Sequence, residues 1–103
     1  MGNPMKIRAA SKDGVTEVKV LMNHEMETGF RKDASGAPIP AWYINEVVAK
    51  LNGKVAMEAQ WGPSVSKNPY LAFKIKGGAP GDKVSVSWTD SKGDTRADEV
   101  TVS

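Results

Sequence analysis

Several residue types are scarce or absent in this chain of 103 residues, and each absence narrows what the protein can do. It has no cysteine, which excludes a thiol nucleophile, a thiolate metal site or a disulfide formed within the chain. The spacing assigns no nucleophile or orienting acid to its one histidine, His24, so we predict no catalytic residue. The apolar runs are far too short to span a membrane, and residues 1–6 lack the apolar segment of a signal peptide.

Charge of one sign is not gathered into blocks either. The 14 basic and 12 acidic residues alternate along the chain and leave a formal net charge of +2. A dedicated nucleic-acid binder usually concentrates its basic residues in a patch, so this distribution argues against nucleic acid as a partner. A basic stripe assembled by folding is the less favoured alternative.

What the sequence does contain is apolar alternation of period two, the pattern of half-buried β-strands, with frequent turn signals between the runs. The pair Asn52-Gly53 is the strongest hairpin signal, and Asp90 and Asp94 are expected as turn formers. About seven short strands predict a single all-β domain over residues 1–103, an immunoglobulin-like β-sandwich. The predicted strands cover residues 6–10, 15–22, 42–51, 55–61, 70–76, 84–88 and 95–102.

Four of these segments place apolar side chains on one face, which we predict to be the core. The inward residues are Val18, Val20 and Met22; Val55, Met57, Ala59 and Trp61; Leu71, Phe73 and Ile75; and Val84, Val86 and Trp88.

Two irregular segments are candidates for function. Residues 23–40 form an unusually long connection for a compact domain, and such loops tend to be functional or mobile. Residues 61–70 run from Trp61 to Tyr70 with two prolines between them, which favours a loop of defined shape. The loop from Trp61 to Tyr70 contains no acid, histidine or cysteine, so we predict that it serves docking rather than catalysis.

Met22, His24 and Met26 alternate and would point the same way on an extended backbone. Two thioethers and an imidazole suit Cu(I), so a Cu(I)-binding periplasmic β-sandwich is the alternative function. The favoured interpretation is that Met22 packs in the core and Met26 fills a gap under the long segment. We therefore predict no metal site and no cofactor.

Four segments together carry a resemblance to the SoxZ family, the non-catalytic subunit of the SoxYZ sulfur carrier of bacterial thiosulfate oxidation. The resemblance covers nearly the whole chain, with one departure at Glu25, where relatives have proline. The segments are Lys12 to Lys19, His24 to Asp33, Glu58 to Tyr70, and Gly81 to Val84 with Trp88 and Lys92 to Asp94.

The resemblance implies an immunoglobulin-like sandwich that pairs with a SoxY-type subunit and meets other Sox enzymes transiently. In that family the cysteine that bears the sulfur intermediates belongs to SoxY, which agrees with the lack of cysteine here. It also implies a periplasmic location reached by co-export with the partner, which carries the export signal. We expect the partner interface on the two irregular segments, at Met26, Phe30, Trp61, Val65 and Tyr70.

Overall fold

The computed structural model describes residues 2–103 and confirms the all-β prediction, with seven strands and no helix in that range. No helix in these residues is therefore long and apolar enough to cross a membrane. The strands are β1 (Lys6–Lys12), β2 (Val15–Leu21), β3 (Ile44–Leu51), β4 (Lys54–Gln60), β5 (Tyr70–Lys76), β6 (Lys83–Asp90) and β7 (Thr95–Thr101).

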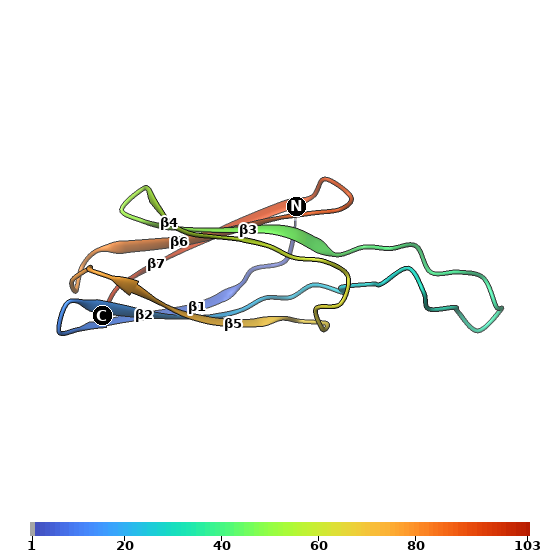
Figure 1. Ribbon diagram of the computed structural model, residues 1–103, viewed down its shortest axis with the longest axis horizontal. Helices are drawn as coiled ribbons and strands as arrows, with labels where there is room; N and C mark the ends of the chain where they lie inside the picture. Colours follow the sequence, from blue (N-terminus) through green and yellow to red (C-terminus); the bar gives the residue numbers. More distant parts are fainter. Residues whose placement is uncertain (1) are drawn as a thin grey trace.

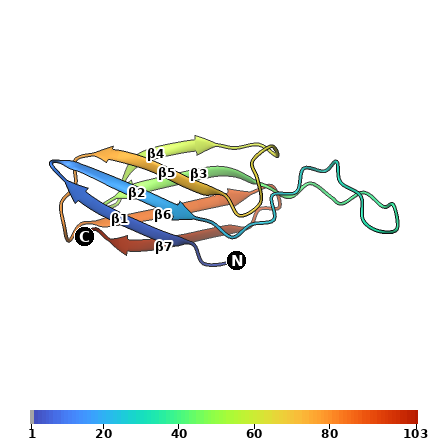
Figure 2. The same cartoon turned by 90° about the horizontal axis from the view of Figure 1, so that it is seen from below.

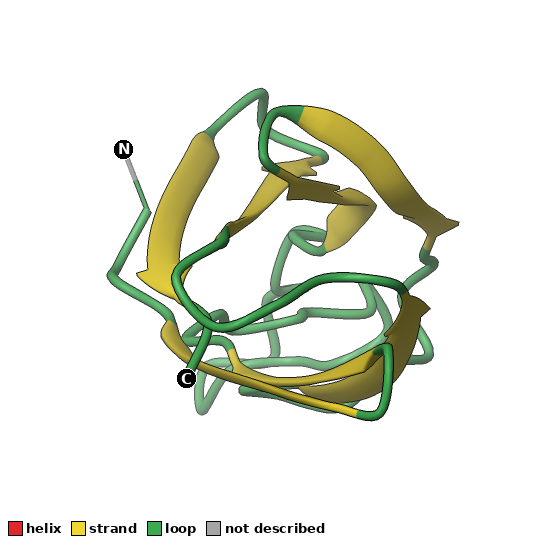
Figure 3. Ribbon diagram, turned by 90° about the vertical axis from the view of Figure 1, so that its left-hand side faces the viewer, coloured by secondary structure: helices red, strands yellow, loops and turns green. Residues whose placement is uncertain are grey.

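The strands form two antiparallel sheets that face each other as the layers of a sandwich (Figures 1 and 3). One sheet has three strands in the order β1-β2-β5, and the other has four in the order β4-β3-β6-β7. The chain crosses between the layers from β2 to β3, from β4 to β5 and from β5 to β6. Two facing sheets connected in this way give the immunoglobulin-like arrangement that the strand count predicted.

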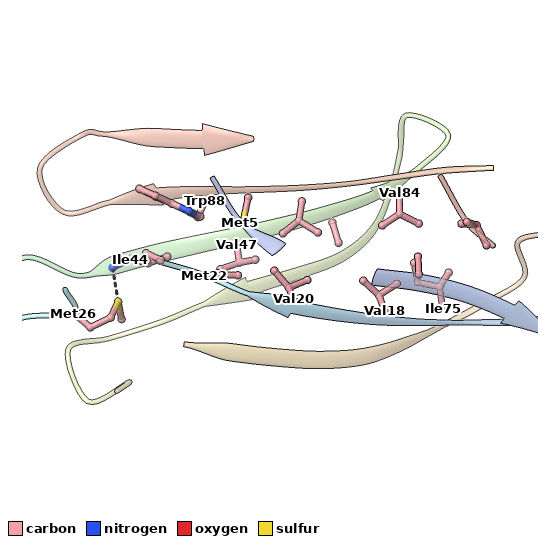
Figure 4. Packing of buried hydrophobic residues seen from close by; sticks show 14 residues of the cluster. Met5, Val18, Val20, Met22, Met26, Ile44, Val47, Ile75, Val84 and Trp88 are labelled. Atoms are coloured by element: carbon pink, nitrogen blue, oxygen red, sulfur yellow. Dashed lines mark hydrogen bonds between the residues drawn. The ribbon is translucent and has the colours of Figure 1, made fainter. Parts of the chain in front are cut away.

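The core lies between the layers and is built from the inward side of each strand. β-Branched residues dominate it: Val18 and Val20 of β2, Val47 of β3, and Val84 and Val86 of β6 are completely buried (Figure 4). Branched side chains pack well on a pleated surface, so the alternation in the sequence is satisfied on both inner faces.

One inward assignment is wrong. Ala49 of β3 pairs with Met57 of β4, but the next residue, Lys50, pairs with Val55. Ala56 is therefore an extra residue on β4, and such a bulge reverses the alternation beyond it. Val55 consequently points outward with Lys50 and is exposed, whereas Met57 stays against the core.

The molecule is longer than a sandwich of this size needs to be. Its principal extents are 54 × 20 × 19 Å and its radius of gyration is 15.4 Å, whereas a compact domain of this length has about 13 Å. The excess comes from the segment between β2 and β3, which projects beyond the end of both sheets (Figures 1 and 2).

The turn between β5 and β6 gives a first prediction. Gly78 has a φ of +87°, and a Cβ there would overlap Oγ1 of Thr16. Thr16 is completely buried, and its hydroxyl donates a hydrogen bond of 2.8 Å to the Gly77 carbonyl. We expect Gly78→Ala to lower the free energy of unfolding by about 2–3 kcal/mol, because backbone strain and overpacking add.

Urea unfolding measures this loss, and Gly53→Ala is the matched control. Gly53 has nearly the same φ, +83°, but open space around the position of a Cβ. It should lose only about 1 kcal/mol, from backbone strain alone. Equal losses in the two variants would contradict the assigned contact with Thr16.

Candidate partner interface

Residues 23–43, here called the arm, leave the end of β2 and return to β3 as two legs lying side by side (Figure 1). Isolated bridges join the legs at Glu27 with Trp42 and at Lys32 with Pro38. At the tip, Asp33 Oδ1 accepts hydrogen bonds from the side chain and backbone of Ser35 and from the backbone of Ala37. The arm is thus a loose hairpin with its own hydrogen bonds, not the irregular loop that the sequence predicted.

The base of the arm is held by His24, which is buried although it begins a surface segment. Its Nδ1 accepts the Met26 N–H at 3.0 Å, which assigns the proton to Nε2. Nε2 then donates to Asp90 Oδ2 at 3.0 Å. The ring also meets Trp42 and Trp88 edge-to-face, with centroids 5.0 and 5.1 Å away. His24 therefore connects the arm to β6 by polar and aromatic contacts together.

Asp90 is the acceptor on which this network converges. Its Oδ2 accepts from His24 and, at 2.7 Å, from Trp42 Nε1, while its Oδ1 accepts the backbone N–H groups of Lys92 and Asp94. Burial acts to raise the pKa of Asp90, but these hydrogen bonds to the carboxylate outweigh it and hold the pKa below its usual range. One ionised side chain thus caps the β6–β7 turn and fixes both legs of the arm.

Met26 follows His24 and turns the chain outward. It has a φ of +51°, which is uncommon for a residue with a long side chain. The conformation is held because Met26 is buried, with 5% of its surface exposed, and its Sδ accepts the Ile44 N–H at 3.3 Å (Figure 4). The surrounding contacts determine the backbone at this point, so the arm leaves the sandwich in a defined direction.

The loop of residues 61–69 lies beside the base of the arm. His24 N–H donates to Asn68 Oδ1 at 3.1 Å, and Asn68 N–H donates back to the His24 carbonyl at 2.9 Å. Lys67 and Glu25 add an ion pair at 3.2 Å. The structure therefore brings together the two segments that the sequence singled out for docking.

The five residues predicted for the interface lie in different environments. Phe30, on the arm, is 89% exposed, and Tyr70, at the start of β5, is 62% exposed. Trp61 and Val65 are half-buried and pack against the core. Met26 belongs to the core, so in this chain alone only Phe30 and Tyr70 offer most of their side chain to a partner.

The hydrogen bonds of His24 argue against the Cu(I) alternative on Met22, His24 and Met26. Both ring nitrogens of His24 are engaged, one as acceptor and one as donor, so neither has a lone pair left for a metal. Met22 and Met26 are buried in the core, as the favoured interpretation predicted.

Sequence reasoning missed Asp90, which it treated as a turn former, and Trp42, which it placed in β3. The signal for Asp90 was its register: it continues the inward series Val84, Val86 and Trp88 and is buried with them. Trp42 lies outside β3, which begins at Ile44, because it pairs with Glu27 across the arm.

These features define a class: an immunoglobulin-like β-sandwich of seven strands with an ordered arm that projects from one end. Within that class the chain belongs to the SoxZ family, since the model of the family described as sulphur oxidation protein SoxZ matches residues 5–101. The predicted resemblance is thus confirmed, and membership gives the chain a role in the Sox sulfur-oxidation system with a partner in that system. A search among curated proteins found no match.

Proposed function

We propose that this chain is the scaffold subunit of a SoxYZ-type sulfur carrier complex in thiosulfate oxidation. It pairs with a SoxY-type subunit whose cysteine carries the sulfur intermediates, and it brings no catalytic residue, metal or cofactor of its own. The complex acts in the periplasm, which the chain reaches by export together with its signal-bearing partner. Membership of the SoxZ family supports the assignment of the chain to sulfur oxidation.

The main support for this pairing is the exposed and ordered arm. Residues 30–38 are all exposed, so their order comes from bonds within the arm rather than from packing on the sandwich. Phe30 is more exposed than any other large apolar side chain in the described residues. A projecting apolar residue of this kind is a typical interface anchor, because a partner gains its full burial on binding.

The base of the arm also favours binding. Arg31 makes two hydrogen bonds to the Glu27 carboxylate, at 2.9 and 2.6 Å, and the buried network at His24 and Asp90 fixes the departure of both legs. A segment that is ordered before binding loses less conformational entropy when the complex forms. The arm is therefore suited to a permanent partner.

Co-expression with the SoxY-type subunit tests the proposal. We expect a stable 1:1 complex in size exclusion with light scattering, and protection from hydrogen exchange confined mainly to residues 23–43 and 61–70. The turn at Asn52 and Gly53, at the opposite end of the sheets, is the internal control and should exchange equally in both states. Two independent monomers at micromolar concentration would contradict the proposal.

A further inference from the structure

The outer face of the three-stranded sheet is strongly basic. In β1 and β5 the even-numbered side chains point away from the core, and in β2 the odd-numbered ones do. This surface, here called the basic face, carries six cationic side chains and one acidic one, Glu17. The cationic residues are Lys6, Arg8 and Lys12 of β1, Lys19 of β2, and Lys74 and Lys76 of β5.

The fold therefore separates charge that is mixed along the sequence. The basic face has a net charge of +5, whereas the whole chain has +2. The alternation of acidic and basic residues concealed this, because every second residue of a strand turns away from the face. The stripe that the sequence disfavoured exists, and Figure 2 looks onto the sheet that bears it.

This arrangement is unfavourable for the isolated domain. Arg8 and Lys19 are directly opposite each other in the β1–β2 register, and like charges in such a position destabilise a sheet. Glu17 offsets part of the repulsion, since it lies opposite Lys74 and 3.4 Å from Lys19. Lysines on edge strands protect against aggregation, which accounts for β1 and β5 but not for Lys19 on the central strand.

Apolar side chains lie at both ends of the basic face. Leu21 and Tyr70 are register partners at the end near the arm, 42% and 62% exposed, and Val15 is exposed at the other end. Tyrosine is enriched in protein interfaces, where its ring adds apolar contact area. Five of the six cations are lysines, which lack the bidentate geometry that arginine offers to phosphate. The composition favours a protein partner over nucleic acid.

We propose that the basic face docks an acidic surface on an enzyme of the Sox system that acts on the carrier. This inference rests on the proposed function. The basic face lies along the side of the sandwich, whereas the arm projects from its end (Figures 1 and 2). A partner held by the arm and the neighbouring loop would meet the face only at the end that holds Tyr70, and the cationic side chains farther along β1, β2 and β5 would stay accessible. Complementary charge would raise the rate of encounter with an enzyme that binds only transiently.

The double variant Arg8→Glu, Lys76→Glu tests this docking. It lowers the charge of the basic face by four units, yet it should fold normally, because the first change turns the Arg8–Lys19 repulsion into attraction. The matched control is Lys50→Glu, Lys83→Glu, with the same change in net charge at exposed positions of β3 and β6 in the other sheet. Binding of the reconstituted carrier complex to each purified Sox enzyme is measured at low and physiological salt.

We expect the double variant to bind at least one enzyme about tenfold more weakly at low salt, with the loss reduced as salt rises. The control should stay within about twofold, because it leaves the basic face intact. Binding to duplex DNA and to anionic vesicles is measured under the same conditions. Unchanged binding to every enzyme, or weaker binding only to the DNA or the vesicles, overturns the proposal. The chain without its partner is assayed in parallel. Failure to pair with a SoxY-type subunit would count against the proposed function, whereas docking to the basic face could still be measured on the chain alone.

Discussion

We expect Asp90→Asn to lower the free energy of unfolding by about 3 kcal/mol, as removal of a buried, fully hydrogen-bonded charge does. The asparagine can keep one oxygen facing the N–H groups of Lys92 and Asp94. Its NH₂ group would then face two other donors, His24 Nε2–H and Trp42 Nε1–H. His24 cannot move its proton away from Nε2, because Nδ1 already accepts the Met26 N–H.

Urea unfolding followed by tryptophan fluorescence measures the loss, since Trp42 and Trp88 both contact His24. The matched control is Asp13→Asn, the same chemical change in an exposed turn with a φ of +54°, which asparagine adopts readily. It should stay within about 0.5 kcal/mol of the wild type. Equal stability of the two variants would show that the Asp90 network does not hold the base of the arm.

The pH dependence of stability provides a second measurement. The folded pKa of Asp90 lies below its unfolded value, which is about 3.9. Its contribution is therefore fully present above that value and is lost as the pH falls toward the folded pKa. Asp90→Asn has no proton to bind at this position. The free energy of unfolding of the variant should thus fall less steeply than that of the wild type between pH 5 and pH 2. The two slopes should differ by at most the uptake of one proton on unfolding, which is about 1.4 kcal/mol per pH unit.

The sequence predicted the sandwich well because period-two alternation is a local property. Strand positions follow from residues such as Val18, Val20, Val84 and Val86, which have one inward direction whichever strand they pair with. The error at Val55 has a non-local cause, since the bulge is visible only once β4 is paired with β3. Register with a neighbouring strand is not encoded in the alternation of a single strand.

The candidate site was harder to predict because its parts come from distant segments. The bond from His24 to Asp90 joins residues 66 positions apart, and Lys19 meets Arg8 only through strand pairing. The sequence could place the arm and the loop of residues 61–69 as unusual segments, but not their contact through Asn68. Polar networks and charged faces are created by topology, so they become visible after the strand order is known.

Shortening the arm should greatly weaken pairing with the SoxY-type subunit while the sandwich stays folded. Residues 29–40 are replaced by Asn-Gly, which joins Thr28 to Ala41 and keeps the bridge between Glu27 and Trp42 closed by a two-residue hairpin turn. The contacts of His24 and Met26 lie on the retained side, so we expect stability within about 1 kcal/mol of the wild type. The dissociation constant for the partner should rise more than about 100-fold, because the exposed anchor Phe30 is removed with the legs.

Two point variants separate the contribution of the side chain from that of the backbone. Phe30→Ser keeps the full arm and should weaken pairing by about tenfold or more, since it removes only the apolar anchor. Val55→Ser removes another exposed apolar side chain, on β4, and should leave the dissociation constant within about twofold. If the shortened chain pairs as tightly as the wild type, the interface lies on the sandwich. The exposure of Phe30 and the buried network at the base of the arm would then need a different explanation.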